Sequence, residues 1–296
     1  MSITAVVVTY QPDAKIIPNL RRLAAQVSKI IVVDNGSGPA SAPVLETISQ
    51  FPEVELVRND SNLGIAVALN IGIRRAREFK PDWIATFDQD SAISAGFFEG
   101  LFRAGEACPK KFKIGMLVPA QHRRQETSVV QSDTPAKSLF TFVATPITSG
   151  SVIKSGMFSI VGEYDDGLFI DLVDIDYCLR LRRAGFKIVS ATGVTLTHQL
   201  GFIHTRKVLF FPFSYRTHSP WRYYYIMRNR ILLYRRHGLA FPGWVLKDVA
   251  FIIYDFVKIL FWEDKTLMRL RLCLSGLWDG WRGRSGRHAQ FPAQSQ

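Results

Sequence analysis

Apolar runs alternate with amphipathic stretches through the first third of the chain. Runs rich in β-branched residues predict buried strands at 3–9, 29–34, 53–58 and 82–88. Between these strands, apolar residues at helical spacing predict helices at 12–27, 41–50 and 64–79. This rhythm is typical of a parallel sheet with helices on both faces, so the predicted fold class is α/β.

The pattern is less regular beyond residue 95. Helices are expected at 96–106, 174–184 and 219–237. Strands are expected at 114–118, 139–146 and 186–191. The last dozen residues are expected to form a loose tail, because they show no periodic apolar pattern.

The stretch 244–262 is strongly apolar but is interrupted by charge. Four charged residues fall within one arc of a helix: Lys247, Asp248, Asp255 and Lys258. Lys265 and Arg269 extend the same stripe, and the longest unbroken apolar run has only six residues, which disfavours a spanning helix. Two interpretations stay open. The helix lies in a membrane interface, or it docks on the rest of the fold or on a second subunit.

Charge is distributed unevenly along the chain. Residues 1–178 hold 17 Lys/Arg and 20 Asp/Glu, for −3, whereas residues 179–296 hold 20 and 5, for +15. Such asymmetry indicates an anionic partner: nucleic acid, a membrane surface or phosphates. The basic, aromatic segment WRYYYIMRNRILLYRR at 221–236 favours anionic lipid. A nucleic-acid partner is not expected, because no RNA-binding or helix-turn-helix signature is found.

Composition excludes several classes of protein. Apolar residues make up 47% and charged residues 21%, which excludes a disordered chain, a fibre and a coiled-coil rod. Three widely separated cysteines form no CxxC, so neither a disulfide framework nor a zinc ribbon is expected. A cytosolic environment fits this usage, and the N-terminus has no features of a signal peptide.

The most informative chemistry is Asp88-Gln89-Asp90, directly after a predicted buried strand. Ligands of open α/β sheets bind outside the carboxyl ends of the strands. Two carboxylates at i and i+2 can share a divalent cation, and hard oxygen donors suit Mg²⁺ or Mn²⁺ bound together with substrate phosphates. A DxD triplet by itself is more often a solvated turn, and it is the preceding strand that strengthens the prediction.

Other polar residues have both a structural and a functional interpretation. Asp34 ends a strand, and it either caps a turn or accepts hydrogen bonds from a ribose or nucleobase. Asn62 is either a helix cap or, before Gly64, part of a phosphate-binding helix start. The acids Asp171, Asp174 and Asp176 either complement a helix dipole or include a general base. His198 is a lone histidine after a strand, which is more often structural than a metal ligand.

Several enzyme classes are disfavoured because their motifs are absent. The sequence has no GxGxxG, Walker A loop, GxSxG or HExxH. These absences disfavour a dinucleotide dehydrogenase, a P-loop NTPase, an α/β-hydrolase and a zincin. The remaining interpretation is a site that binds a diphosphate through a metal ion but has no phosphoryl-transfer motif.

Seven motifs, in this order, resemble glycosyltransferase family 2, the inverting nucleotide-sugar enzymes with a GT-A fold. They are VVVTYQP (6–12), VVDNGS (32–37), NLGIAVALNIGI (62–73), DQDS (88–91), TSG (148–150), FIDLVDIDYCLRLRRAGFKI (169–188) and HQLG (198–201). The more specific forms resemble the bacterial rhamnosyltransferase branch, which uses dTDP-L-rhamnose. SPWRYYYIMRNRILLYRR (219–236) and LWDGWRGRSG (277–286) also look like that branch. The resemblance covers about residues 3–286.

The resemblance implies roles for individual residues. The nucleotide would contact Thr9, Tyr10, Asp34, Asn62 and Asp88. Asp90 would bind the metal, Mg²⁺ or Mn²⁺, with His198 and Asp88 as further ligands. Ser149 and Gly150 would lie near the sugar, and Arg206 and Lys207 near phosphates. Asp174 would be the general base, with Asp171 as its rival, although Val173 occupies the position where the family usually has Glu.

The implied reaction transfers L-rhamnose from dTDP-β-L-rhamnose, with inversion, to a lipid-linked or polysaccharide acceptor. O-antigen, exopolysaccharide or other glycolipid synthesis is the expected setting, on the inner face of a bacterial cytoplasmic membrane. A homodimer through the C-terminal helices is also considered. A UDP-hexose or UDP-HexNAc donor and a non-catalytic scaffold of polysaccharide assembly are the alternatives.

A division into two domains follows from the motifs and the charge. Residues 1–205 are expected to form a GT-A domain, with a nucleotide-binding half at about 1–95 and an acceptor-binding half at about 96–205. Residues 206–296 are expected to form a basic, aromatic and mainly helical region that associates with membrane.

Overall fold

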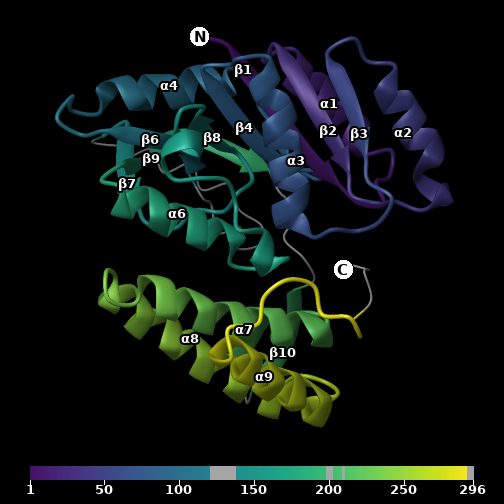
Figure 1. The fold of residues 1–296 in the computed structure, drawn as a ribbon, viewed down its shortest axis with the longest axis vertical. Coiled ribbons are helices and arrows are strands. Elements are labelled where there is room, and N and C mark those ends of the chain that lie inside the picture. The colour runs from purple at the N-terminus through teal and green to yellow at the C-terminus, as the bar shows by residue number, and fades with distance from the viewer. Residues whose placement is uncertain (121–137, 198–202, 209–210, 292–296) are drawn as a thin grey trace. The chain divides into compact units, whose positions relative to one another are not determined.

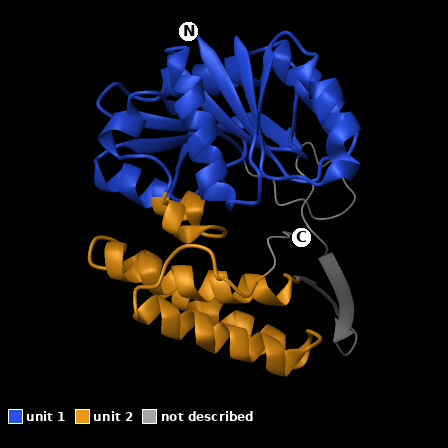
Figure 2. Ribbon diagram, turned by 45° about the vertical axis from the view of Figure 1, so that its right-hand side comes forward, with its two compact units in different colours: residues 1–164, 177–198 blue, residues 165–176, 199–296 orange. Residues whose placement is uncertain are grey.

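The computed structural model describes residues 1–120, 138–197, 203–208 and 211–291, with the backbone alone over 203–208 and 211–216. Its chain forms two compact units (Figure 2). The first comprises residues 1–164 and 177–198, and the second comprises 165–176 and 199–296. Helix α6 (Val173–Arg183) therefore begins in the second unit and continues in the first.

Four parallel strands form one half of the sheet in the first unit. In spatial order they are β3 (Val54–Arg58), β2 (Lys29–Asp34), β1 (Ile3–Thr9) and β4 (Trp83–Asp88). The connections carry α1 (Ile16–Ala24), the 3-10 turn η1 (Pro39–Ser41), α2 (Ala42–Ser49) and α3 (Ile65–Glu78). The predicted strand–helix alternation is confirmed here, and each strand lies within a residue of its expected bounds.

The other half of the sheet is mixed in direction. β8 (Ser151–Lys154) runs antiparallel to β4 and to β6 (Ile114–Ala120), while β9 (Lys187–Thr197) runs parallel to β6. The short strands β5 (Ala92–Ile93) and β7 (Phe140–Val143) pair antiparallel with β9. The helical segments are α4 (Phe97–Ala107), α5 (Met157–Ile160) and the 3-10 turn η2 (Asp166–Leu168) of the second unit.

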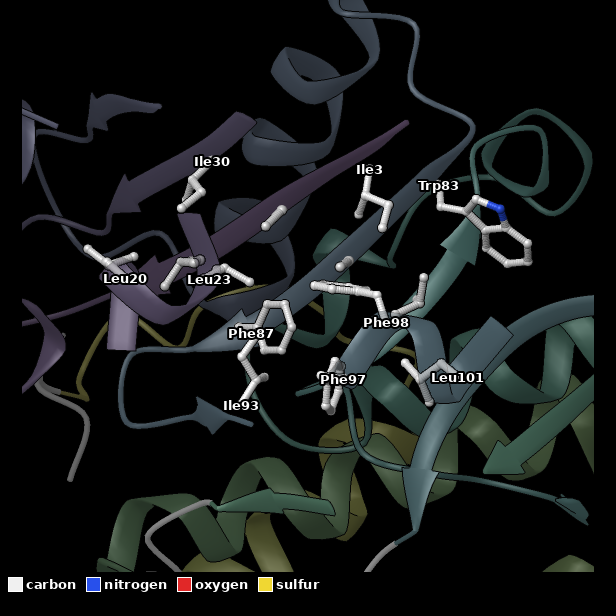
Figure 3. Close-up of a cluster of buried hydrophobic side chains, with 14 of the residues drawn as sticks. Ile3, Leu20, Leu23, Ile30, Trp83, Phe87, Ile93, Phe97, Phe98 and Leu101 are labelled. Carbon is white, nitrogen blue, oxygen red and sulfur yellow. The ribbon is translucent and has the colours of Figure 1, made fainter. Parts of the chain in front are cut away.

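The main core lies beneath α1 and α4, against the sheet (Figure 3). All seven residues of β1 are buried, as the β-branched run predicts. Phe87, Phe97 and Phe98 pack edge to face or tilted, with ring centroids 5.3–6.4 Å apart. On the opposite face, Gly72 of α3 lets that helix approach closely, because a Cβ there would lie 2.3 Å from Val6 Cγ1. The core therefore fixes the strand ends relative to one another.

Three helices and a hairpin make up most of the second unit. β10 (Ile203–Val208) and β11 (Phe211–Arg216) pair antiparallel, and α7 (Pro220–His237), α8 (Pro242–Phe261) and α9 (Thr266–Trp281) follow (Figure 1). Glycines allow α9 to lie directly on α7. A Cβ at Gly276 would be 2.3 Å from the Tyr224 carbonyl oxygen, and one at Gly280 would be 2.5 Å from that of Arg228.

The expectation of a loose C-terminal tail was wrong for its first part. The His288 amide donates to the Tyr225 hydroxyl at 2.9 Å, and Phe291 packs on Tyr224 with ring centroids 5.0 Å apart. These contacts arise because α7 presents adjacent tyrosines, which a local sequence pattern does not reveal; residues 292–296 lie outside the described residues. Among the described helices, none is both long and apolar enough to cross a membrane.

Candidate active site

The carboxyl ends of three neighbouring strands bring the predicted site residues of the first unit together. Thr9 of β1 pairs in register with Asp34 of β2, and Val8 pairs with Asp88 of β4. Thr9, Asp34 and Asp88 therefore lie along one edge of the sheet, where ligands of open α/β sheets bind. Thr9 and Asp34 are buried, whereas Asp88 and Asp90 are half-buried.

Gln89 ties the loop after β4 to the end of β1. Its Oε1 accepts a hydrogen bond from the Thr9 hydroxyl at 2.7 Å and another from the Tyr10 amide at 2.9 Å. One side-chain oxygen thus fixes Gln89, the residue between Asp88 and Asp90 in the sequence. Sequence reasoning missed Gln89, and the one available signal was its position between Asp88 and Asp90.

A second set of hydrogen bonds holds the same loop from the side of β8. The Asp88 amide donates to Ser149 Oγ at 3.1 Å, and the Ser149 and Ser91 hydroxyl oxygens lie 2.6 Å apart. The Gly150 amide donates to the Thr86 carbonyl at 2.8 Å, with Gly150 at φ +78°. The buried Ser149 hydroxyl is thus used to position the loop, which was not part of the role expected for it.

Asp34 is built into the turn that follows β2. Both its carboxylate oxygens accept from Ser37, one from the hydroxyl and one from the backbone amide. Ser37 Oγ in turn accepts from the Gln11 amide at 2.7 Å. Asp34 therefore caps the turn after β2, as one of its two interpretations predicts. Through Ser37 it also connects this turn with the loop after β1, at the same edge of the sheet.

Three asparagines connect this turn with the start of α3. Asn35 Nδ2 donates to Asn62 Oδ1 at 3.0 Å, and Asn59 Nδ2 donates to Asn35 Oδ1 at 3.1 Å. Asn62 Oδ1 also accepts from the Gly64 amide at 2.9 Å. Gly36, at φ +84°, packs so tightly that a Cβ would lie 2.3 Å from the Ser61 carbonyl carbon. Asn62 thus organises the loop around the site edge.

The donor set at the end of β4 fits a divalent cation that is shared with a ligand. Asp88 and Asp90 supply hard oxygen donors two residues apart. Across the described part of the chain, no group of three or more His, Cys, Asp or Glu could hold a metal by itself. Mg²⁺ commonly binds through one or two carboxylates and completes its shell with phosphates and waters. His198, the other expected ligand, lies outside the described residues.

In the second unit, Asp171 is held by an arginine of α7. Arg222 donates Nη2–H to Asp171 Oδ1 at 2.5 Å and Nε–H to Oδ2 at 3.2 Å. Asn229 Nδ2 donates to the carbonyls of Ile170 and Asp171 at 2.8 and 2.9 Å. Asp171 and Leu172 have positive φ, 64° and 59°, which these contacts from α7 stabilise.

The remaining acids differ in their surroundings. Asp176 is buried and its Oδ1 lies 2.9 Å from His237 Nε2. Asp174, in the first turn of α6, is half-buried, and its Oδ1 accepts from the Ile175 amide at 2.8 Å.

His218, which precedes α7, is a neutral histidine. Burial, with Arg222 nearby, lowers the pKa of His218 to about 4, so this histidine is neutral at pH 7.

Arg206 and Lys207, the expected phosphate contacts, lie on β10. Their backbones pair in register with Phe213 and Pro212 of β11. Their roles stay predictions, as do the division of the first unit into nucleotide and acceptor halves and the domain boundary at residue 205.

Comparison with known proteins finds similarity to one family and to several named enzymes. Residues 4–139 match the model of "Glycosyl transferase family 2". The chain is 29% identical over 302 residues to the dTDP-rhamnosyl transferase RfbF of Shigella flexneri, covering 96% of this chain and 97% of that relative. It is 24% identical over 234 residues to the N-acetylglucosaminyl-diphospho-decaprenol L-rhamnosyltransferase of Mycobacterium tuberculosis, covering 65% and 74%.

A solved structure supports the fold. The crystal structure of GalNAc-T7 with UDP, GalNAc and Mn²⁺ superimposes with a TM-score of 0.53 at 14% identity. The match covers 67% of this chain and 43% of that one, so the chain spans less than half of GalNAc-T7. This likeness confirms the expected GT-A-like α/β fold. Residues 4–139 match the glycosyl transferase family 2 model, and the chain is a glycosyltransferase.

Proposed function

We propose that this glycosyltransferase transfers L-rhamnose from dTDP-β-L-rhamnose to an acceptor hydroxyl, with inversion at the anomeric carbon. The two relatives described above are named rhamnosyltransferases, and the alignment with one of them spans almost the full length of both chains. Donor specificity depends on several loops spread along the chain, so a relative that aligns over almost its whole length is the better guide to the donor.

The observation that carries the proposal is the loop after β4, which is clamped from two sides. Gln89 anchors it to Thr9 and Tyr10, and Ser149 anchors it through Asp88 and Ser91. Two carboxylates at the edge of a parallel sheet suit a divalent cation shared with a nucleoside diphosphate, because Mg²⁺ commonly binds through one or two carboxylates plus substrate phosphates.

The proposed nucleotide contacts follow this edge. Thr9, Tyr10 and Asp34 would meet the nucleoside, with Asn62 shaping the neighbouring loop. Asp88 would face the ribose, and Asp90 would bind Mg²⁺ or Mn²⁺ on the diphosphate, with His198 as a further ligand. When bound, the metal supplies Lewis-acid stabilisation of charge on the departing diphosphate.

The remaining proposed contacts involve the sugar and the diphosphate. Ser149 and Gly150 would border the rhamnose, and Arg206 and Lys207 of β10 would meet phosphate oxygens. An arginine or lysine near the departing dTDP would offset its developing negative charge.

Asp174 is the proposed general base. As the acceptor oxygen attacks the anomeric carbon, the bond from that carbon to the dTDP oxygen breaks and the hydroxyl proton passes to the Asp174 carboxylate. Asp171, its rival, has both oxygens engaged by Arg222, so an acceptor hydroxyl would have to compete with that arginine for them. General-base assistance typically contributes about 10²–10⁴-fold to the rate.

The proposed acceptor is a glycan on a polyprenyl diphosphate, as the name of the mycobacterial relative describes for that protein. O-antigen, exopolysaccharide or other glycolipid assembly at the inner face of the cytoplasmic membrane is the corresponding setting. The basic C-terminal third suits a diphosphate-linked lipid acceptor, because cationic side chains attract the diphosphate.

A donor panel tests the proposed donor. The purified chain is mixed with dTDP-L-rhamnose, UDP-glucose, UDP-galactose or UDP-GlcNAc, each with and without Mg²⁺ or Mn²⁺, and nucleotide release is measured. We expect metal-dependent release of dTDP from dTDP-L-rhamnose. Release from a UDP-sugar instead, or from no donor, would reject the proposed donor.

Substitutions test the base. Asp174→Asn should reduce turnover by about 10²–10⁴-fold while leaving the affinity for dTDP unchanged. Asp171→Asn serves as the matched variant, and it should retain more turnover than Asp174→Asn. The reverse order of the two variants would assign the base to Asp171.

A further inference from the structure

Three charged residues of α8, Asp248, Asp255 and Lys258, are buried or half-buried. Many apolar residues of the same helix are exposed, and only part of its apolar surface, including Ile259, packs inward. Asp248 Oδ2 accepts from the Tyr234 hydroxyl at 2.6 Å and lies 3.2 Å from Arg230 Nε, both on α7. Asp255 Oδ2 accepts from Arg230 Nη1 at 2.9 Å, and Lys258 is buried beside Asp255. These three charged side chains are therefore paired within the helical unit, while Lys247 on the same side is exposed.

The opposite sides of α8 and α9 expose large apolar side chains. On α8, Leu246, Ile253 and Phe261 are exposed by 75%, 61% and 72%. On α9, Trp278 and Trp281 are exposed by 55% and 66%, and their rings stack. Surface helices of a globular protein place these residue types in the core, so this face is built for an apolar environment. We call it the outer face of α8 and α9.

The exposed charges of the C-terminal segment that carries the outer face are almost all positive. Between residues 217 and 291, which the structure describes throughout, Asp264 is the one exposed acid, and the other four acids are buried or half-buried. The exposed cations of the same segment are Arg235, Arg236, Lys247, Lys265, Arg271, Arg282, Arg284 and Arg287. An apolar face on a segment whose exposed charges are almost all cationic complements an anionic lipid surface.

We propose that the outer face of α8 and α9 inserts into the headgroup–acyl boundary of an anionic bilayer, with the helices lying in its plane. Figure 1 shows the two helices running along α7, and their contacts with one another and with α7 join them into one body. Pairing with a second copy is disfavoured, because it would bring two sets of cations together. The proposal concerns binding to lipid and does not depend on the sugar donor or the acceptor.

Vesicle binding by the full-length chain tests this proposal. The chain is mixed with vesicles of phosphatidylglycerol and phosphatidylcholine, or of phosphatidylcholine alone, and the sedimented fraction is measured. We expect stronger binding to the anionic vesicles, and weaker binding as salt is raised. Equal binding to both kinds of vesicle, or none to either, would overturn the proposal.

Two matched isoleucine variants distinguish insertion of the outer face into the bilayer from nonspecific hydrophobic adsorption. Ile253→Gln removes an apolar side chain from the outer face, and Ile160→Gln removes one of nearly equal exposure, 58%, from α5 of the first unit. Ile253→Gln should lower vesicle partitioning about tenfold, and Ile160→Gln should leave it unchanged. Because both side chains are exposed, unchanged thermal unfolding confirms that both variants fold.

Two further outcomes would overturn the proposal. If both isoleucine variants partition like the wild type, the outer face does not meet lipid. If sedimentation equilibrium shows a wild-type dimer that Ile253→Gln dissociates, with vesicle binding unchanged, the outer face is an interface between copies of this chain.

Discussion

Gln89 offers the sharpest test of how the candidate site is held together. Gln89→Ala removes the acceptor for the Thr9 hydroxyl and for the Tyr10 amide. The Thr9 side chain is almost fully buried, so its hydroxyl loses a partner that water cannot readily replace. A lost bond that water can replace costs about 1 kcal/mol and an unsatisfied buried group about 1–3 kcal/mol. We expect a loss of about 3 kcal/mol in the free energy of unfolding.

In addition to lowering the free energy of unfolding, Gln89→Ala should also raise the KM for the sugar nucleotide. With the Gln89 anchor gone, the loop that carries Asp88 and Asp90 is held from the Ser149 side alone. The KM for the sugar nucleotide should therefore rise as the chain loses stability. Urea unfolding measures the first quantity. Initial rates of nucleotide release over a range of donor concentrations measure the second.

Gln26 provides the matched control. Its side chain donates to the Ser94 carbonyl at 2.9 Å and accepts from the Phe97 amide at 3.0 Å, away from the sheet edge. Gln26→Ala should cost similar stability and leave the donor KM unchanged. The reasoning is refuted if Gln89→Ala and Gln26→Ala give the same KM.

Three further predictions concern packing, pH and metal. Gly72→Ala should destabilise the chain by about 1–3 kcal/mol in urea unfolding, because its Cβ meets Val6, whereas Gly38→Ala, with open space around it, should change stability far less. The neutral His218 takes up a proton on unfolding, so stability should fall by up to about 3 kcal/mol as pH falls from about 6.5 to about 4. His218→Gln should flatten that part of the pH profile, and an unaltered profile would contradict the assignment. In thermal shift, Mg²⁺ should increase stabilisation by dTDP, Asp90→Asn should remove the increase, and an increase that persists would exclude Asp90 as a ligand.

The sequence predicted those elements whose apolar pattern is long and local. The run Ile3–Thr9 could be recognised because a buried parallel strand is continuously β-branched. β8 escaped notice, because Ser151–Lys154 is too short for a period to show. Its place between β4 and β6 depends on tertiary pairing.

For the candidate site, the sequence predicted the positions of several residues but not their hydrogen-bond and ion-pair partners. Strand ends located Asp34, Asp88 and Asp90, since parallel strands bring their carboxyl ends to one edge. The partners of these residues could not be found, because they depend on packing between distant segments. Arg222 reaches Asp171 from 51 positions along the chain. For α8 the sequence grouped its charges into one stripe but did not reveal that α7 supplies the partners for that stripe.

The attachment of the loop 165–172 to α7 constrains how such enzymes can be recombined. Arg228 and Asn229 both donate to the Leu168 carbonyl, and Arg236 is paired with Asp165. A chimera joined after residue 205 would place this loop beside another protein's helix, and these contacts would form only if that helix supplied the same donors. When parts of such enzymes are exchanged, the loop and α7 should therefore be transplanted together.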